Sequence, residues 1–295
     1  MAGKKPLLPA SSTPVEEPDK LSSCFQQEFL PMFVRTICLY GLAMAAFLFS
    51  GCSNQLDVAT DFTVDKTISK EKLPDFSSYT NVKEKKQAFF SFIERLADEA
   101  NREIMAERSA LLAIKEYGKY DELDDDANEF LQTLASKYRL EDVKETSKLV
   151  ERLLVRVAPV PPSLAMAQAA NESAWGTSRF AVKGNNLFGQ WCFSKGCGIV
   201  PEQRAGDAFH EVASFKSPYA SVRSYMLNIN RHDAYRELRR IRSEAMKNKG
   251  FASGTVVAGG LESYSERGHE YIDEVRSMIR FNKLGKYDQP ETSDS

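Results

Sequence analysis

The stretch AQAANESAWGTSRF, Ala167–Phe180, decides how the rest of the chain is interpreted. It continues a run of small apolar residues that begins after Pro161-Pro162, with Ser163 as the expected cap, and ends at Trp175-Gly176. Proline near a serine cap and glycine after the last periodic residue are start and stop signals of a helix. We therefore expect a helix here, with Glu172 in its last turn.

Glu172 is a candidate general acid because of its neighbours. Leu164, Gln168 and Glu172 fall on one face of the expected helix, each four residues from the next. A helix this rich in alanine packs closely, so Glu172 should be at least half buried, and burial raises the pKa of a carboxyl towards the working range of a general acid. A lone glutamate at a helix end is more often a solvated surface residue. The downstream stretch GNNLFGQW, 184–191, favours the catalytic interpretation, since carbohydrate-facing loops often combine Gly, Asn and aromatics.

Two motifs resemble a known family of enzymes. QAANESAWG at 168–176 and NLFG at 186–189 resemble the signature of the glucosaminidase domain, the family 73 glycoside hydrolases of the bacterial cell wall. The stretches 189–198 and 264–268 resemble an inner subgroup of that family, and the whole resemblance runs from about residue 75 to Leu284. It implies a mainly α (α+β), lysozyme-like helical domain with a small β-hairpin insertion. It also implies cleavage of β-1,4 bonds at N-acetylglucosamine in peptidoglycan, with Glu172 as the general acid.

Glycosidases usually pair two carboxylates, so a second one is expected. The resemblance places it in the β-prone insertion, ahead of the FKSPY segment at 215–219. Counting back from Phe215 reaches Glu202, whereas counting forward from Glu172 reaches Glu211. The strand-like context before Glu202 favours Glu202 as the catalytic partner. A substrate with an N-acetyl group can also supply its own nucleophile, in which case one acid suffices.

Further site residues follow from the resemblance. The stretch YSERGHEY at 264–271 matches the family's terminal segment, in which a tyrosine lines the cleft beside the catalytic glutamate. We expect Tyr264 in a catalytic role and Tyr271 in substrate binding, with core packing as the alternative for either ring. Asn186 and Phe188 are expected substrate-binding or cleft-wall residues, and Trp191 is the better candidate for stacking on a sugar.

The N-terminus resembles a secretory signal. Arg35 precedes an apolar run at 37–49, too short to span a bilayer, which needs roughly 20 residues. Ser50-Gly51-Cys52 resembles a bacterial lipobox, so Cys52 is expected to carry lipid, although Phe49 departs from the usual leucine. The long leader is explained if translation starts at Met32. A buried helix or an uncleaved anchor is the alternative. Ser53, rather than aspartate, favours the outer over the inner membrane, facing the periplasm.

Removal of the signal would leave two cysteines besides Cys52, namely Cys192 and Cys197. Thiols in an oxidising compartment pair when geometry allows, so a disulfide is expected. A zinc site would need further Cys or His ligands nearby, which the sequence lacks. There is also no phosphate-binding glycine loop, so we expect no metal and no cofactor.

The sequence divides into five segments. The net charge is −2, and nothing indicates nucleic-acid binding; the expected partners are peptidoglycan glycan strands and, through lipid, a membrane. Mostly helical periodicity interrupted by one β-prone insertion predicts a single substantial core. The expected segments are a leader and signal (1–52), a tether (53–81), a helical N-terminal region (82–157), the glucosaminidase-like domain (158–284) and a disordered tail (285–295).

Two other functions remain open at this point. A muramidase or lytic transglycosylase also ends a helix in a Glu-Ser pair. A non-hydrolytic glycan-binding scaffold could retain the cleft, but it would have no need of a buried acid.

Overall fold

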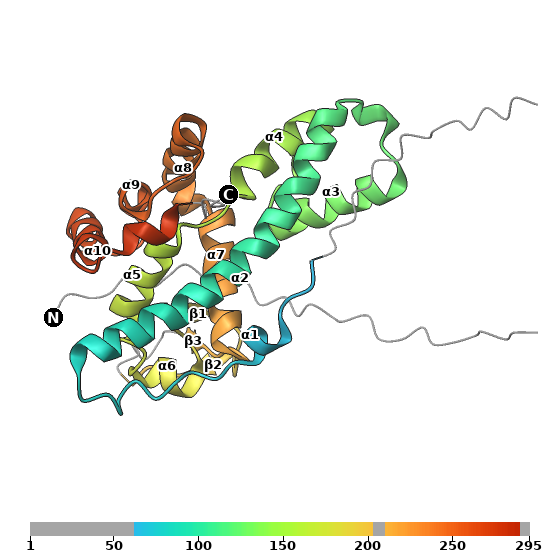
Figure 1. Ribbon diagram of the computed structural model, residues 1–295. Coiled ribbons are helices and arrows are strands. Elements are labelled where there is room, and N and C mark those ends of the chain that lie inside the picture. Colours follow the sequence, from blue (N-terminus) through green and yellow to red (C-terminus); the bar gives the residue numbers. More distant parts are fainter. Residues whose placement is uncertain (1–61, 203–209, 290–295) are drawn as a thin grey trace, which may run out of the picture. The chain divides into compact units, whose positions relative to one another are not determined.

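The computed structural model describes residues 62–202 and 210–289, so Cys52 and the expected signal lie outside the described residues. Within these ranges the protein is mainly helical with one small sheet, as the sequence predicts (Figure 1). The first half contains α1 (Lys66–Lys70), α2 (Val82–Tyr117), η1 (Tyr120–Glu122), α3 (Asp125–Lys137), α4 (Thr146–Arg156), α5 (Pro162–Glu172) and α6 (Arg179–Gly184). The second half contains β1 (Trp191–Cys192), β2 (Gly198–Ile199), β3 (Glu211–Ala213), α7 (Pro218–Arg231), η2 (Asp233–Tyr235), α8 (Arg236–Lys249), α9 (Gly254–Val257), η3 (Ala258–Gly260), α10 (His269–Phe281) and η4 (Leu284–Asp288).

The long helix α2 is the element on which much of the core is built. The Asn81 side chain caps its start by accepting hydrogen bonds from the backbone N–H groups of Lys83 and Glu84, and Gly118 ends it in the left-handed conformation. One face is buried at helical spacing and packs against α4, α5 and α7. That face includes Phe89, Ile93, Leu96, Ala100, Ile104, Leu111 and Ile114.

Helix α5 is enclosed by its neighbours. Every residue from Ser163 to Ala170 is buried, which the small side chains allow because they let other backbones approach closely. The helix contacts α2, α9, α10 and η4, and Figure 1 shows it between α2 and the C-terminal helices. The helix begins at Pro162, with Pro161 rather than Ser163 at the cap position. It ends at Glu172 as expected, so the candidate acid stands where a buried element meets a loop.

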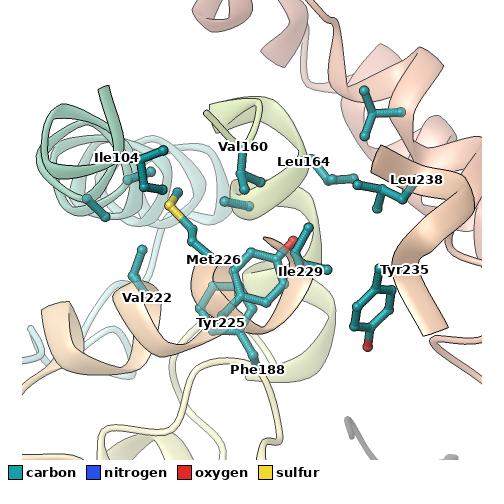
Figure 2. Close-up of a cluster of buried hydrophobic side chains, with 14 of the residues drawn as sticks. Ile104, Val160, Leu164, Phe188, Val222, Tyr225, Met226, Ile229, Tyr235 and Leu238 are labelled. Atoms are coloured by element: carbon teal, nitrogen blue, oxygen red, sulfur yellow. The ribbon is translucent and has the colours of Figure 1, made fainter. Parts of the chain in front are cut away.

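A second part of the core lies along α7. Figure 2 shows Tyr225 beside Phe188, and their rings stack with centroids 3.9 Å apart. Met226 and Ile229 extend the same buried cluster towards α2, α5 and α8. None of the helices described is both long and apolar enough to cross a membrane.

The β-prone insertion forms a three-stranded antiparallel sheet with the order β1-β3-β2. Trp191 faces Val212 across the first pair of strands, and Gly198 faces Ala213 across the second. A Cβ atom at Gly198 would lie 2.0 Å from the Val212 carbonyl oxygen, so only glycine permits this pairing. The expected hairpin is therefore present with one additional strand.

Two expected segment boundaries differ from the structure. The described part of the expected tether, 62–81, contains helix α1 and places Phe76 in the core, 1% exposed, against Phe89 and Phe92. The expected tail begins within η4, where Asp288 is buried and accepts hydrogen bonds from Ser163 and Gly254. Both segments are polar in composition, and a few long-range contacts hold their described parts, 62–81 and 285–289, in place.

Candidate active site

Glu172 is fixed by the turn that follows α5. The Ser173 hydroxyl donates to the Ala169 carbonyl at 2.6 Å and accepts from the Gly176 N–H at 2.7 Å, which closes the helix end. The Trp175 ring packs edge-on against Phe90, with centroids 5.2 Å apart, and so attaches the turn to α2. Glu172 itself is partly exposed, in contrast to the buried residues before it. The carboxylate is thus held on a rigid element while remaining accessible.

Tyr271 on α10 is a direct partner of this carboxylate. The phenol hydroxyl of Tyr271 donates to Oε1 of Glu172 at 3.0 Å, so the structure brings two of the candidate site residues together. Burial, together with the neighbouring Glu172 charge, raises the pKa of Tyr271 well above its usual value. The phenol therefore stays protonated and acts as a hydrogen-bond donor over the whole neutral range.

Tyr264 supports Tyr271 rather than bonding to the acid. The two rings stack with centroids 5.0 Å apart and planes within 9° of parallel. Tyr264 is 3% exposed, and its hydroxyl has no hydrogen-bond partner among the described residues. Its position next to Tyr271 agrees with the expected neighbourhood, and its buried hydroxyl favours a packing role over direct chemistry.

Gly189 faces the other oxygen of Glu172. A Cβ atom built at Gly189 would lie 3.9 Å from Oε2, and no other atom of the described residues would lie within 4 Å of it outside the neighbouring residues. Gly189 has φ +65°, a backbone conformation that glycine adopts without strain. The loop after α6 therefore brings a residue without a side chain next to Oε2 of Glu172.

Asn186 organises this loop from within. Its amide nitrogen donates to the carbonyls of Gln190 and Ala213, both at 2.8 Å, and its oxygen accepts from the N–H groups of Phe188 and Gln190. Asn186 is 1% exposed, and Phe188 is fully buried. Both residues, expected near substrate, therefore shape the loop that carries Gly189 instead of presenting polar or aromatic groups to solvent.

Trp191 lies at the start of β1, after this loop. Its ring is partly exposed and stacks on the His210 ring, with centroids 3.6 Å apart and planes within 7° of parallel. The His210 ring therefore covers one face of the Trp191 ring.

The two candidates for a second carboxylate have contrasting environments. The Glu202 side chain is 79% exposed and forms an ion pair with Arg179 at 3.2 Å. Glu211 is 6% exposed, and its two oxygens accept hydrogen bonds from the N–H groups of Gly196, at 3.0 Å, and Gly198, at 2.8 Å. Glu211 therefore holds the loop between β1 and β2, whereas Glu202 has a carboxylate that solvent can reach.

Cys192 and Cys197 are joined by a disulfide that closes this same loop, with Cα atoms 6.2 Å apart. Their sulfur atoms and the Glu211 carboxylate form the group of three potential metal ligands found among the described residues. Sulfur in a disulfide is not a thiolate and does not bind zinc in the usual way. The cluster is therefore structural.

Sequence reasoning missed two residues connected to the acid. Gln168, one turn before Glu172, donates from Nε2 to the Tyr271 oxygen at 3.0 Å and accepts at Oε1 from the Tyr225 hydroxyl at 2.5 Å. The four-residue spacing on one helix face was the available signal for Gln168. Tyr225 lies on α7, and no local signal connects it to Glu172.

The fold and this site define a glucosaminidase-domain protein. The family model described as mannosyl-glycoprotein endo-beta-N-acetylglucosaminidase matches residues 148–284, a range that includes Glu172, the small sheet and Tyr271. Protein bax of Escherichia coli (strain K12) is 30% identical over 212 residues, which cover 72% of this chain and 74% of that protein. The chain belongs to this family. No solved structure matches the chain.

Proposed function

We propose that the protein is a peptidoglycan hydrolase, an endo-β-N-acetylglucosaminidase in which Glu172 is the general acid. The observation that carries this proposal is the setting of one carboxylate: it ends a buried helix, Tyr271 donates to one of its oxygens, and the backbone of Gly189 lies close to the other. The family membership supports glycan hydrolysis. The glycan strands of peptidoglycan are the proposed substrate.

The proposed chemistry begins with proton donation. Glu172 gives its proton to the glycosidic oxygen, the bond from the anomeric carbon to that oxygen breaks, and the bonding electrons stay on the departing oxygen. Stabilisation of the opposite side of the sugar comes either from Glu202, the exposed carboxylate, or from the substrate's own N-acetyl group. Water then forms the new bond to the anomeric carbon, and the proton that it loses goes to a carboxylate, Glu172 or Glu202. Trp191, whose ring is partly exposed, is the proposed sugar platform.

The test is a digestion of purified peptidoglycan with the full-length protein, followed by mass spectrometry of the soluble products. A reducing-end N-acetylglucosamine is the expected product. A reducing-end muramic acid would instead identify a muramidase, and an anhydro sugar would identify a lytic transglycosylase. Wall binding without any sugar release would identify a scaffold. Any of these three results contradicts the proposal.

We also propose that Cys52 carries a lipid and holds the protein at a periplasm-facing membrane, the outer membrane in preference to the inner. This rests on the order of Arg35, the apolar run at 37–49 and Ser50-Gly51-Cys52 in the sequence. Multiple acyl chains anchor stably where one does not, at about 0.8 kcal/mol per buried methylene. Cys52→Ser should leave the membrane fraction or remain an unprocessed precursor. Unchanged partitioning and migration of that variant would refute the lipid anchor.

A further inference from the structure

A directed chain of hydrogen bonds ends on the Glu172 carboxylate. The Tyr225 hydroxyl donates to Oε1 of Gln168 at 2.5 Å, and Nε2 of Gln168 donates to the Tyr271 oxygen at 3.0 Å. Tyr271 in turn donates to Oε1 of Glu172 at 3.0 Å. The members come from three elements, α7, α5 and α10. Gln168 and Tyr225 have no exposed surface, so water does not compete for these bonds.

Gln168 determines the direction of this chain. A side-chain amide has a donor end and an acceptor end, whereas a phenol carries a single proton. Because the Tyr271 oxygen already accepts from Gln168, its one proton is directed to Glu172. If the amide were reversed, Tyr271 would donate its proton to the Gln168 oxygen. Glu172 could then form a hydrogen bond with Tyr271 only as the donor, through its own O–H group. In the observed orientation the Gln168 oxygen accepts from Tyr225 and its nitrogen donates to Tyr271.

The two tyrosines remain donors throughout the neutral range. Burial raises the pKa of Tyr225 and of Tyr271 well above the usual value of a phenol, and the Glu172 charge acts in the same direction on both. Each phenol therefore keeps the proton that its hydrogen bond in the chain requires.

Other titratable groups lie on the elements next to α5. Tyr264 stacks on Tyr271 in the segment before α10. Lys86 on α2 lies over the Trp175 ring, 5.0 Å from its centroid. Asp288 in η4 bonds to Ser163, at the opposite end of α5 from Glu172. Helix α9, with the sequence GTVV, contains no titratable side chain.

We propose that Gln168 is a positioning residue that keeps the Tyr271 proton directed at Oε1 of Glu172. The proposal rests on the proposed function, because that function names Glu172 as the acid. When the O–H bond of Glu172 breaks and the proton moves to the glycosidic oxygen, negative charge appears on the carboxylate. The hydrogen bond from Tyr271 is already directed at that charge and needs no rearrangement.

The experiment follows the protonation of Glu172 directly. Full-length protein labelled at the glutamate side-chain carboxyl carbon is titrated by NMR, and the Glu172 signal is the one lost in Glu172→Gln. Tyr271→Phe should raise the titration midpoint by about one pH unit, because the charged form loses a donor. Gln168→Met, which keeps the side-chain length, should raise the midpoint by about half a unit or more on the same basis.

The deciding measurement is the double variant. If Gln168 acts through Tyr271, Gln168→Met should not shift the midpoint further in a Tyr271→Phe background. Tyr235→Phe is the matched control: it removes a buried hydroxyl that has no hydrogen-bond partner among the described residues, and it should leave the midpoint unchanged. A Gln168→Met midpoint equal to that of the wild type, or shifts that add in the double variant, would overturn the proposal.

A replacement variant and a readout that is independent of activity keep the experiment decisive. If Gln168→Met does not fold, Tyr225→Phe takes its place. This variant removes the hydroxyl that donates to the Gln168 oxygen and keeps the ring that stacks on Phe188. Its shift should likewise vanish in the Tyr271→Phe background. The titration needs no turnover, so it is independent of the proposed activity. If the Gln168→Met shift vanishes in the Tyr271→Phe background but no sugar is released, the positioning role stands and the proposed hydrolase activity fails. If sugar is released but the two shifts are independent, the hydrolase activity stands and the positioning role fails.

Discussion

Two consecutive non-glycine residues after the candidate acid, Ala174 and Trp175, hold left-handed backbone conformations, with φ 51° and 61°. Such conformations cost free energy for residues with a Cβ atom and tend to gather at functional sites. Here the Trp175 N–H bonds to the Ala170 carbonyl, and its ring packs against Phe90. These contacts offset the strain and fix the residue at which α5 ends. They therefore also fix where the Glu172 carboxylate lies.

The closeness of Gly189 to the Glu172 carboxylate gives the first prediction. Gly189→Ala should lower kcat/KM by about 10- to 100-fold, because the new methyl group would contact Oε2 where the sugar must approach. The left-handed backbone should also cost about 1 kcal/mol of stability. Kinetics on peptidoglycan and urea unfolding measure the two effects separately.

Gly250 provides the matched control for this prediction. It has φ +78°, and a Cβ atom there would have no neighbour within 4 Å. Gly250→Ala should therefore show the same loss of stability with normal activity. Equal activity in the two variants would show that Gly189 does not border the reacting groups.

At the scale of elements, the loop between β1 and β2 is held in two ways, by the Cys192–Cys197 disulfide and by the Glu211 carboxylate. We predict that the denatured, unreduced protein shows no reactive thiol at either cysteine. Replacing both cysteines by serine should lower the free energy of unfolding by about 2 kcal/mol, the value expected for so short a loop. Thiol counting and urea unfolding test this. Two reactive thiols in protein prepared under oxidising conditions would contradict it.

Which elements the sequence predicts depends on how local their signals are. The apolar stripe of α2 and the proline and glycine around α5 are local signals, and α5 ends at Glu172 as the sequence predicts. Helix α1 and η4 were not expected, because Phe76 and Asp288 are held by residues distant in the chain, Phe89 and Ser163. A composition typical of a tether or tail cannot reveal such contacts.

The same distinction applies to the candidate site. Glu172 and Tyr271 follow from sequence motifs, but the bond between them joins residues 99 positions apart. The choice between Glu202 and Glu211 is ambiguous when residues are counted. The structure separates their environments because Glu211 bonds to the backbone of the neighbouring loop. Hydrogen bonding in three dimensions, rather than residue type, distinguishes these carboxylates.

On the scale of the whole molecule, Glu103 connects three helices. From α2 its carboxylate accepts two hydrogen bonds from Arg223 on α7, at 2.5 and 2.6 Å, and one from Lys137 on α3, at 2.9 Å. Burial alone would raise the pKa of Glu103, but Arg223 and Lys137 hold it at about 2, below the ordinary value of 4.5. Arg223 and Lys137 thus favour the charged form of Glu103 in the folded state.

This gives a prediction for acid stability. Because the folded-state pKa of Glu103 is depressed, its contribution is present above about pH 4.5 and is lost as the pH falls towards 2. We expect about 2–3 kcal/mol of unfolding free energy to disappear over this window, and Glu103→Gln should flatten the dependence. Glu122→Gln, at an exposed pair with Lys119, is the control and should keep the wild-type profile. Urea unfolding at a series of pH values measures this, and equal slopes in Glu103→Gln and wild type would refute it.

The most direct test of the central claim, that Glu172 is the general acid, compares wild type and Glu172→Gln on purified peptidoglycan. The amide keeps an oxygen that can accept from Tyr271, but its N–H groups are not acidic enough to protonate the glycosidic oxygen. The fold and wall binding should therefore persist, while release of reducing-end N-acetylglucosamine, measured by mass spectrometry, falls by about 10²–10⁴-fold. Turnover close to that of the wild type in Glu172→Gln would contradict the account.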